Sequence, residues 1–172
     1  MTIERIGARA LLCCLVWSSA CLAQSVNGLD NPDWAEGQVP PPPALSTAQL
    51  MPISMPPYIT VQVDVDSASI QVGEDGVVRY VMVMRNRSGN TTAVYEGIRC
   101  ASAEVKTYAR LGTDGQWSML PNAPWKNLTD KTPSPHALAF ARQAACDGPV
   151  TYSRRDILDA LKTPRRIIPT TH

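Results

Sequence analysis

Hydrophobic and polar residues alternate in short runs between residues 58 and 120, as they do in half-buried β-strands. The alternation predicts strands at 59–65, 69–72, 77–84, 91–98, 104–111 and 116–120. The run at 77–84 is apolar except at Arg79, which indicates a strand buried on most of both faces. Because no helical segment separates the runs, they favour a meander of about five or six antiparallel strands.

The pattern changes to a helical period after residue 133. Pro135 suits a first helical turn, and Ser134 is a candidate N-cap. Apolar residues then recur at helical spacing and predict a helix that ends near Ala145. Ser153 should cap a second helix that extends to about Lys162. Strands first and helices last predict an α+β fold, an antiparallel sheet followed by two C-terminal helices that pack on it.

The composition divides the chain of 172 residues into four parts. Residues 1–23 are expected to form a signal peptide, and residues 24–57 a Pro-rich leader that holds eight of the fifteen prolines. Residues 58–163 are long enough for one domain, and residues 164–172 are expected to form a flexible tail.

The first segment has the three parts of a secretory signal. Two arginines precede an apolar stretch at 10–17, and small residues follow at 18–23. Cleavage after Ala23 would release a soluble chain, whereas cleavage before Cys21 would leave that cysteine lipid-modified and bound to a membrane. Ser18 stands where lipoprotein signals usually carry Leu, which favours cleavage after Ala23. Lipidation at Cys21 stays the alternative.

Of the five cysteines, only Cys100 and Cys146 lie outside the signal region. Two cysteines in an exported chain have one possible intramolecular pairing, so we expect a disulfide between them. The alternative is a pair of free thiols, one of them catalytic, although no CxxC spacing lowers a thiol pKa here.

The leader contains the run Pro40–Pro43, which is restricted to the extended polyproline II form. We expect it to be a spacer that lies along the domain, and the alternative is a docking site for a partner. Trp34 is the expected anchor of the leader on the domain surface, because a large aromatic ring is costly to leave in water.

The charge of the chain is balanced, with 16 Lys and Arg residues against 15 Asp and Glu residues. This balance argues against nucleic acid as a partner. No apolar run reaches the length of a membrane span, so a membrane is expected only through lipidation. The sequence lacks the common nucleotide-binding, hydrolase and metalloprotease motifs, and we expect no cofactor and no metal site.

The densest polar cluster lies on two of the expected strands and beside the first helix. Period-two spacing places Glu104, Lys106, Tyr108 and Arg110 on one face of their strand. Such a row could bind an anionic ligand, and the alternative is a solvated sheet face with weak ion pairs. The candidate ligand-binding residues are Tyr95, Glu96, Arg99, Lys106, Tyr108, Arg110 and His136.

Several motifs in order resemble the cryptic neisserial protein 1-like (CNP1-like) family of proteobacterial envelope proteins. They span residues 33–162 and include Asp33–Gly37, Tyr95–Cys100, Lys106–Arg110, Asp114–Trp117, Pro135–Ala137 and Cys146–Gly148. The resemblance implies a periplasmic protein, in some members a lipoprotein, with no established activity. It therefore supplies no catalytic residue.

Together these features predict a periplasmic, non-enzymatic interaction or binding module of the cell envelope. Its partner would be an envelope protein or a small anionic ligand. The alternative is a periplasmic hydrolase or transferase that uses Glu96, Tyr95 and His136 as acid, phenol and base.

Overall fold

The computed structural model describes residues 31–130 and 134–163. The expected signal peptide, the Cys21 lipidation site and the expected C-terminal tail lie outside the described residues. No helix in the described part of the chain is long and apolar enough to cross a membrane.

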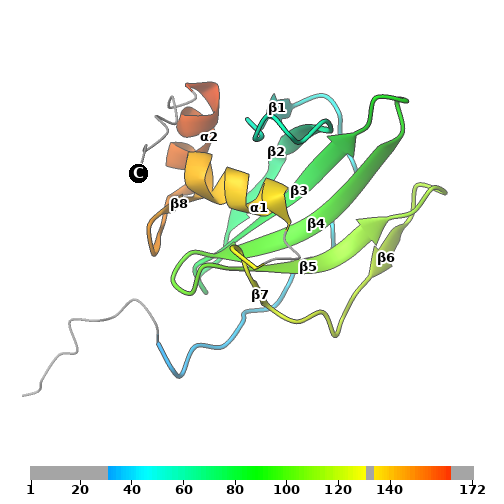
Figure 1. Cartoon of the computed structure of the whole chain (residues 1–172). Coiled ribbons are helices and arrows are strands. Elements are labelled where there is room, and N and C mark those ends of the chain that lie inside the picture. The colour runs from blue at the N-terminus through cyan, green and yellow to red at the C-terminus, as the bar shows by residue number, and fades with distance from the viewer. Residues whose placement is uncertain (1–30, 131–133, 164–172) are drawn as a thin grey trace, which may run out of the picture.

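The centre of the fold is an antiparallel sheet of seven strands (Figure 1). Six strands follow one another in sequence order, and β7 pairs with β5 beside β6. The strands are β1 (Leu50–Pro52), β2 (Gln62–Val72), β3 (Val77–Arg85), β4 (Thr91–Arg99), β5 (Glu104–Leu111), β6 (Trp117–Met119) and β7 (Lys126–Asn127). The predicted α+β class and the meander order are confirmed.

Two C-terminal helical segments cover one face of the sheet, which we call the helix face (Figure 1). The first comprises α1 (Pro135–Phe140) and a π-helical turn η1 (Ala141–Ala145), and the second is α2 (Arg154–Lys162). Ser153 caps α2 as predicted, because its hydroxyl accepts a hydrogen bond from the backbone N–H of Asp156. Ser134 stands at the N-cap position of α1 as predicted, but its side chain makes no capping hydrogen bond.

The core on the helix face joins the sheet to these helices. Tyr80 of β3 packs edge-on against Phe140 of α1, with ring centroids 4.6 Å apart. A disulfide between Cys100 and Cys146 links the segment after β4 to the short strand β8 (Cys146–Asp147). The predicted disulfide is therefore confirmed, and the free-thiol alternative is excluded.

The leader covers the opposite face of the sheet, which we call the leader face (Figure 1). Val39, Leu45 and Leu50 pack against a second buried cluster around Val81, Val83 and Tyr95. The Trp117 indole donates to the backbone oxygen of Pro43 at 2.9 Å, so the proline run lies against its own domain. This cover explains why β3 is buried on both faces, as its apolar run predicted.

Three details differ from the expected elements. The two strands expected at 59–65 and 69–72 are one strand, β2, whose pairing with β3 is irregular between Asp66 and Gln71. The leader contributes a strand of its own, β1, to the sheet edge. The short strands β7 and β9 (Val150–Thr151) were not expected, because two-residue strands leave no periodic pattern.

Candidate functional site

An extra residue in β5 divides the predicted polar row between the two faces of the sheet. Glu96 pairs with Thr107, whereas the neighbouring Tyr95 pairs with Ala109, so Tyr108 is the unpaired residue of a bulge. Beyond a bulge the alternation of side chains reverses. Arg110 therefore lies on the helix face, and the prediction that it shares a face with Lys106 is wrong.

The seven candidate residues consequently form two groups. Glu96, Arg110 and His136 lie around one cavity on the helix face. Tyr95, Arg99, Lys106 and Tyr108 lie on the leader face.

Glu96 is the centre of the helix-face group. Its side chain is almost fully buried, and its two carboxylate oxygens accept three hydrogen bonds. Oε2 lies 3.1 Å from the Tyr80 hydroxyl and 3.0 Å from Nε2 of His136, while Oε1 lies 3.1 Å from the Thr107 hydroxyl. Burial and the adjacent Glu96 carboxylate raise the pKa of Tyr80 well above its ordinary value, so the phenol stays a donor.

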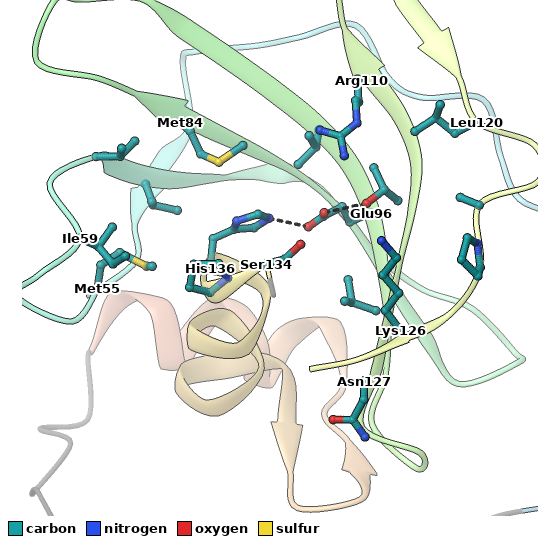
Figure 2. A pocket seen from close by; sticks show the side chains of 18 residues that line it. Met55, Ile59, Met84, Glu96, Arg110, Leu120, Lys126, Asn127, Ser134 and His136 are labelled. Atoms are coloured by element: carbon teal, nitrogen blue, oxygen red, sulfur yellow. Dashed lines mark hydrogen bonds and ion pairs between the residues drawn. The ribbon is translucent and has the colours of Figure 1, made fainter. Parts of the chain in front are cut away.

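Above this group is a cavity of about 560 Å³ (Figure 2). The volume lies within the range of small-molecule sites. His136 enters the cavity from the start of α1, and Glu96 stands beside it on β4. Its apolar wall includes Met55, Ile59, Val63, Met84, Val94 and Leu120.

Two cations line the same cavity. Arg110 comes from β5 and Lys126 from β7, and both side chains are exposed. Among the described residues neither has an ion-pair partner, so both are available to an anion. The cavity thus combines an apolar wall, a buried carboxylate–imidazole pair and two solvent-facing positive charges.

On the leader face, the cations meet groups of the leader itself. The Glu36 carboxylate lies 2.7 Å from Nζ of Lys106 and accepts a hydrogen bond of 2.7 Å from the Tyr108 hydroxyl. Burial, followed by this hydrogen bond, raises the pKa of Tyr108 above its ordinary value. The guanidinium of Arg99 lies 4.0 Å from the ring centroid of Trp34. We call the contacts that the leader residues Trp34, Glu36 and Gly37 make with the domain the leader clasp.

Asp75, in the turn between β2 and β3, completes the clasp. Its carboxylate pairs with Arg79 at 2.6 Å and accepts a hydrogen bond from the N–H of Gly37, while its backbone oxygen accepts one from the Trp34 indole. The expectation that Trp34 anchors the leader is confirmed. The anion that Lys106 and Tyr108 bind in this structure is therefore a side chain of the same protein.

Tyr95 lies beneath the leader, in the buried cluster of the leader face. Its ring packs against Tyr108, with centroids 5.4 Å apart, and burial raises the pKa of its phenol. Adjacent residues of a strand point to opposite faces, so Tyr95 and Glu96 are separated by the sheet. The phenol that contacts Glu96 is that of Tyr80.

Sequence reasoning missed Tyr80 and Thr107, although one signal was present. A β3–β4 hairpin that turns around Ser88 pairs Tyr80 directly with Glu96. A hairpin that joins the expected strands 77–84 and 91–98 therefore indicated Tyr80 as the partner of Glu96. Thr107 could not be found in this way, because its pairing depends on the bulge at Tyr108.

The helix-face site offers two exposed cations and a hydrogen-bonded carboxylate–imidazole pair. No group of three or more His, Cys, Asp or Glu side chains in the described residues could hold a metal ion. The Glu96 carboxylate orients the His136 ring, an arrangement that serves both ligand recognition and general base chemistry.

Comparison with known proteins gives one match. A family model described as the CNP1-like family matches residues 29–162, which include both faces of the sheet and the leader clasp. The comparisons with curated proteins and with solved structures find no match.

Proposed function

The chain belongs to the CNP1-like family, and we propose that it is an exported, non-enzymatic binding module. Its ligand is a small anion with an apolar part, and its binding site is the helix-face cavity. The observation that carries this proposal is a pair of cations, Arg110 and Lys126, that have no ion-pair partner in the described part of the chain and lie on a cavity whose other wall is apolar. Concave, largely apolar sites with a few polar groups are typical of small-molecule binding.

The test uses octanoate as the anionic probe and octanol as its uncharged match. Octanoate should perturb the amide NMR signals of cavity residues and should bind more tightly than octanol. The double variant R110Q/K126Q should weaken octanoate binding by about tenfold or more, because a hydrogen bond to a charged group is lost. The control R155Q/K162Q removes two positive charges from exposed positions of α2 and should bind octanoate normally.

Two outcomes would contradict the proposed function. Octanoate could leave the cavity signals unchanged, or it could bind R110Q/K126Q as tightly as the control variant. The second outcome would show that the two cations do not recognise the anion.

Export to the periplasm is part of the same proposal. It is supported by the basic, apolar and small-residue pattern of residues 1–23 and by the disulfide between Cys100 and Cys146, which suits an oxidising compartment. Intact mass spectrometry of the protein from an envelope fraction tests it. A mass for residues 24–172 supports export and cleavage after Ala23, a lipidated mass starting at Cys21 supports a membrane tether, and an unprocessed chain contradicts export.

A second candidate function is hydrolysis or group transfer, which the short contact between Glu96 and His136 favours. In this reading Glu96 orients the imidazole and His136 acts as general base, with Tyr80 as the phenol in place of the expected Tyr95. For an ester, His136 would take a proton from water as the water oxygen adds to the carbonyl carbon. The imidazolium would then return this proton to the alkoxide oxygen as the carbon–oxygen bond to the leaving group breaks.

Hydrolysis of p-nitrophenyl octanoate tests this candidate. The wild type should release p-nitrophenolate at a rate that R155Q/K162Q retains and His136→Phe loses. Equal rates for wild type and His136→Phe would reject the enzyme reading, while binding of octanoate in the cavity would still support the binding module.

A further inference from the structure

We propose that one end of the sheet binds the surface of an anionic membrane. This end, which we call the hairpin end, comprises the loop 53–61 before β2, the hairpin 86–90 between β3 and β4, the turn 112–116 between β5 and β6, and the strand residues beside them. The inference goes beyond the proposed function, because it rests on the charge and exposure of this end and not on a ligand in the cavity.

The strand register brings the three segments to the same end of the sheet. Gln62, at the start of β2, pairs with Arg85, and Arg85 pairs in turn with Thr91 at the start of β4. The end of β5 and the start of β6 meet in the pair of Leu111 with Trp117. Because the strands are antiparallel, the starts of β2, β4 and β6 lie beside the ends of β3 and β5. Figure 1 shows the β3–β4 hairpin and the β5–β6 turn projecting from that end.

The hairpin end carries a surplus of positive charge, although the charge of the whole chain is balanced. Arg85 ends β3, Arg87 lies in the hairpin, and Arg110 is one residue before the end of β5. Within residues 31–130 and 134–163, none of these three arginines has an ion-pair partner. Asp114 is the only acidic residue in the three connecting segments, and its carboxylate accepts a hydrogen bond from the N–H of Gln116. The arginines are therefore available to external anions.

Hydrogen bonds within the hairpin fix its shape. The N–H of Asn86 donates to the backbone oxygen of Asn90 at 3.0 Å, and the N–H of Gly89 donates to the backbone oxygen of Asn86 at 3.0 Å. The side-chain oxygen of Asn86 also accepts from the N–H of Asn90 at 2.9 Å. Arg87 is exposed on this turn, and Arg85 is half-buried at its base. Because the turn is already ordered, little backbone freedom is lost when it binds a partner.

Tyr58 adds an exposed aromatic ring to the same end. Its side chain is 76% exposed, more than any other large hydrophobic side chain in the described part of the chain. Met55 and Ile59, in the same loop, line the apolar wall of the helix-face cavity. A phenol with an apolar ring and a polar hydroxyl suits the boundary between lipid headgroups and acyl chains.

An anionic bilayer matches both kinds of group. Its phosphates accept hydrogen bonds from arginine, and its headgroup boundary takes up the tyrosine ring. The three arginines come from two strands and a hairpin, which suits a continuous charged surface. A soluble polyanion would satisfy the arginines but would leave Tyr58 without an apolar contact. We therefore expect a peripheral membrane contact, which the balanced charge of the chain did not predict.

The test compares two kinds of vesicle by co-sedimentation. One is made of phosphatidylglycerol and phosphatidylethanolamine in equal parts, and the other, without net charge, is made of phosphatidylcholine. Protein without a lipid at Cys21 should bind the anionic vesicles more tightly. This preference should disappear at about 1 M salt, where the screening length is about 3 Å.

Four variants separate the local charge and the ring from the total charge. R85Q/R87Q should weaken binding to the anionic vesicles by about tenfold or more, because each arginine near an anionic surface contributes to the affinity. R85K/R87K keeps the charge and should bind as the wild type does. R155Q/K162Q removes the same charge from exposed positions of α2 and should also bind normally. Tyr58→Ser leaves the charge unchanged and should weaken binding.

Paramagnetic relaxation in the wild-type protein locates the contact without a variant. With bicelles that contain phosphatidylglycerol and a spin label on a lipid headgroup, the amide signals of Ile59, Arg87 and Gly115 should broaden. Those of Gly73 and Gly76, in the turn at the opposite end of β2 and β3, should not. This measurement keeps the inference testable if R85Q/R87Q fails to fold.

Several results would overturn the membrane contact. They are equal binding to both kinds of vesicle, equal losses in R85Q/R87Q and R155Q/K162Q, and broadening that is strongest at Gly73 and Gly76. Binding to dextran sulfate without binding to anionic vesicles would replace the membrane by a soluble polyanion. The proposed function is tested separately, because R85Q/R87Q leaves the cavity residues intact and should bind octanoate as the wild type does.

Discussion

Replacing Glu36 by Gln tests whether the leader is an integral part of the fold. The side chains of Glu36 and Lys106 are 19% and 15% exposed, so the pair is partly desolvated. In Glu36→Gln the amide oxygen can still accept from Tyr108, but the amide NH₂ then faces the Lys106 ammonium as a second donor. The expected loss of unfolding free energy is about 1–2 kcal/mol, between the values for exposed and fully buried pairs.

Urea unfolding and hydrogen exchange measure this loss in two ways. The matched control is Glu74→Gln, which removes the same charge from an exposed turn position without an ion pair among the described residues. Glu36→Gln should lower the unfolding free energy by more than the control does. It should also speed exchange of the Gly37 amide, which Asp75 protects in the clasp.

A double-mutant cycle with Lys106→Met isolates the contact itself. If the two side chains interact as the structure indicates, the losses of the single variants should not add, and the coupling should be about 1 kcal/mol. The reasoning is refuted if Glu36→Gln and Glu74→Gln behave alike in both assays. A coupling near zero would show that the effect of Glu36 does not arise from its contact with Lys106.

Two further predictions concern the disulfide and the clasp carboxylate. Replacing Cys100 and Cys146, which are 46 positions apart, by Ser should lower the unfolding free energy by up to about 4 kcal/mol, and a loss below about 1 kcal/mol would contradict the chain-entropy argument. Burial alone would raise the pKa of Asp75, but hydrogen bonds from Arg79, Gly37 and Val77 hold it below its ordinary 3.8. The stabilisation from ionised Asp75 is therefore complete above about pH 4 and is lost as the pH falls through the lower folded pKa. Asp75→Asn should be destabilised at pH 7, and its deficit in urea unfolding should shrink under acid; a deficit independent of pH would refute this assignment.

Most of the fold was predictable because its signals are local. Alternation located β3, β4 and β5 to within about one residue, since each of these strands buries at least one face. The helix after Pro135 and the capped helix after Ser153 follow from local spacing and side-chain chemistry. The disulfide followed from the number of cysteines left outside the signal region.

The candidate site was only partly predictable because it depends on register. The interaction of Glu96 with His136 joins residues 40 positions apart, and nothing local requires it. Its residues could be proposed together only because few other polar groups were available for chemistry. The partner of Lys106 was even harder to predict from the sequence, because Glu36 lies 70 positions away in a segment with no strand or helix pattern.

The bulge at Tyr108 explains why the polar residues predicted on one face of β5 lie on both faces of the sheet. Without it, Arg110 would lie on the leader face beside Lys106, and the helix-face cavity would lose one of its two cations. With it, Lys106 and Tyr108 remain on the leader face and hold Glu36, while Arg110 joins Glu96 and His136. One strand thereby supplies the charges for two tasks, the attachment of the leader and the recognition of a ligand. Glu36→Gln should therefore loosen the leader and leave octanoate binding in the helix-face cavity unchanged.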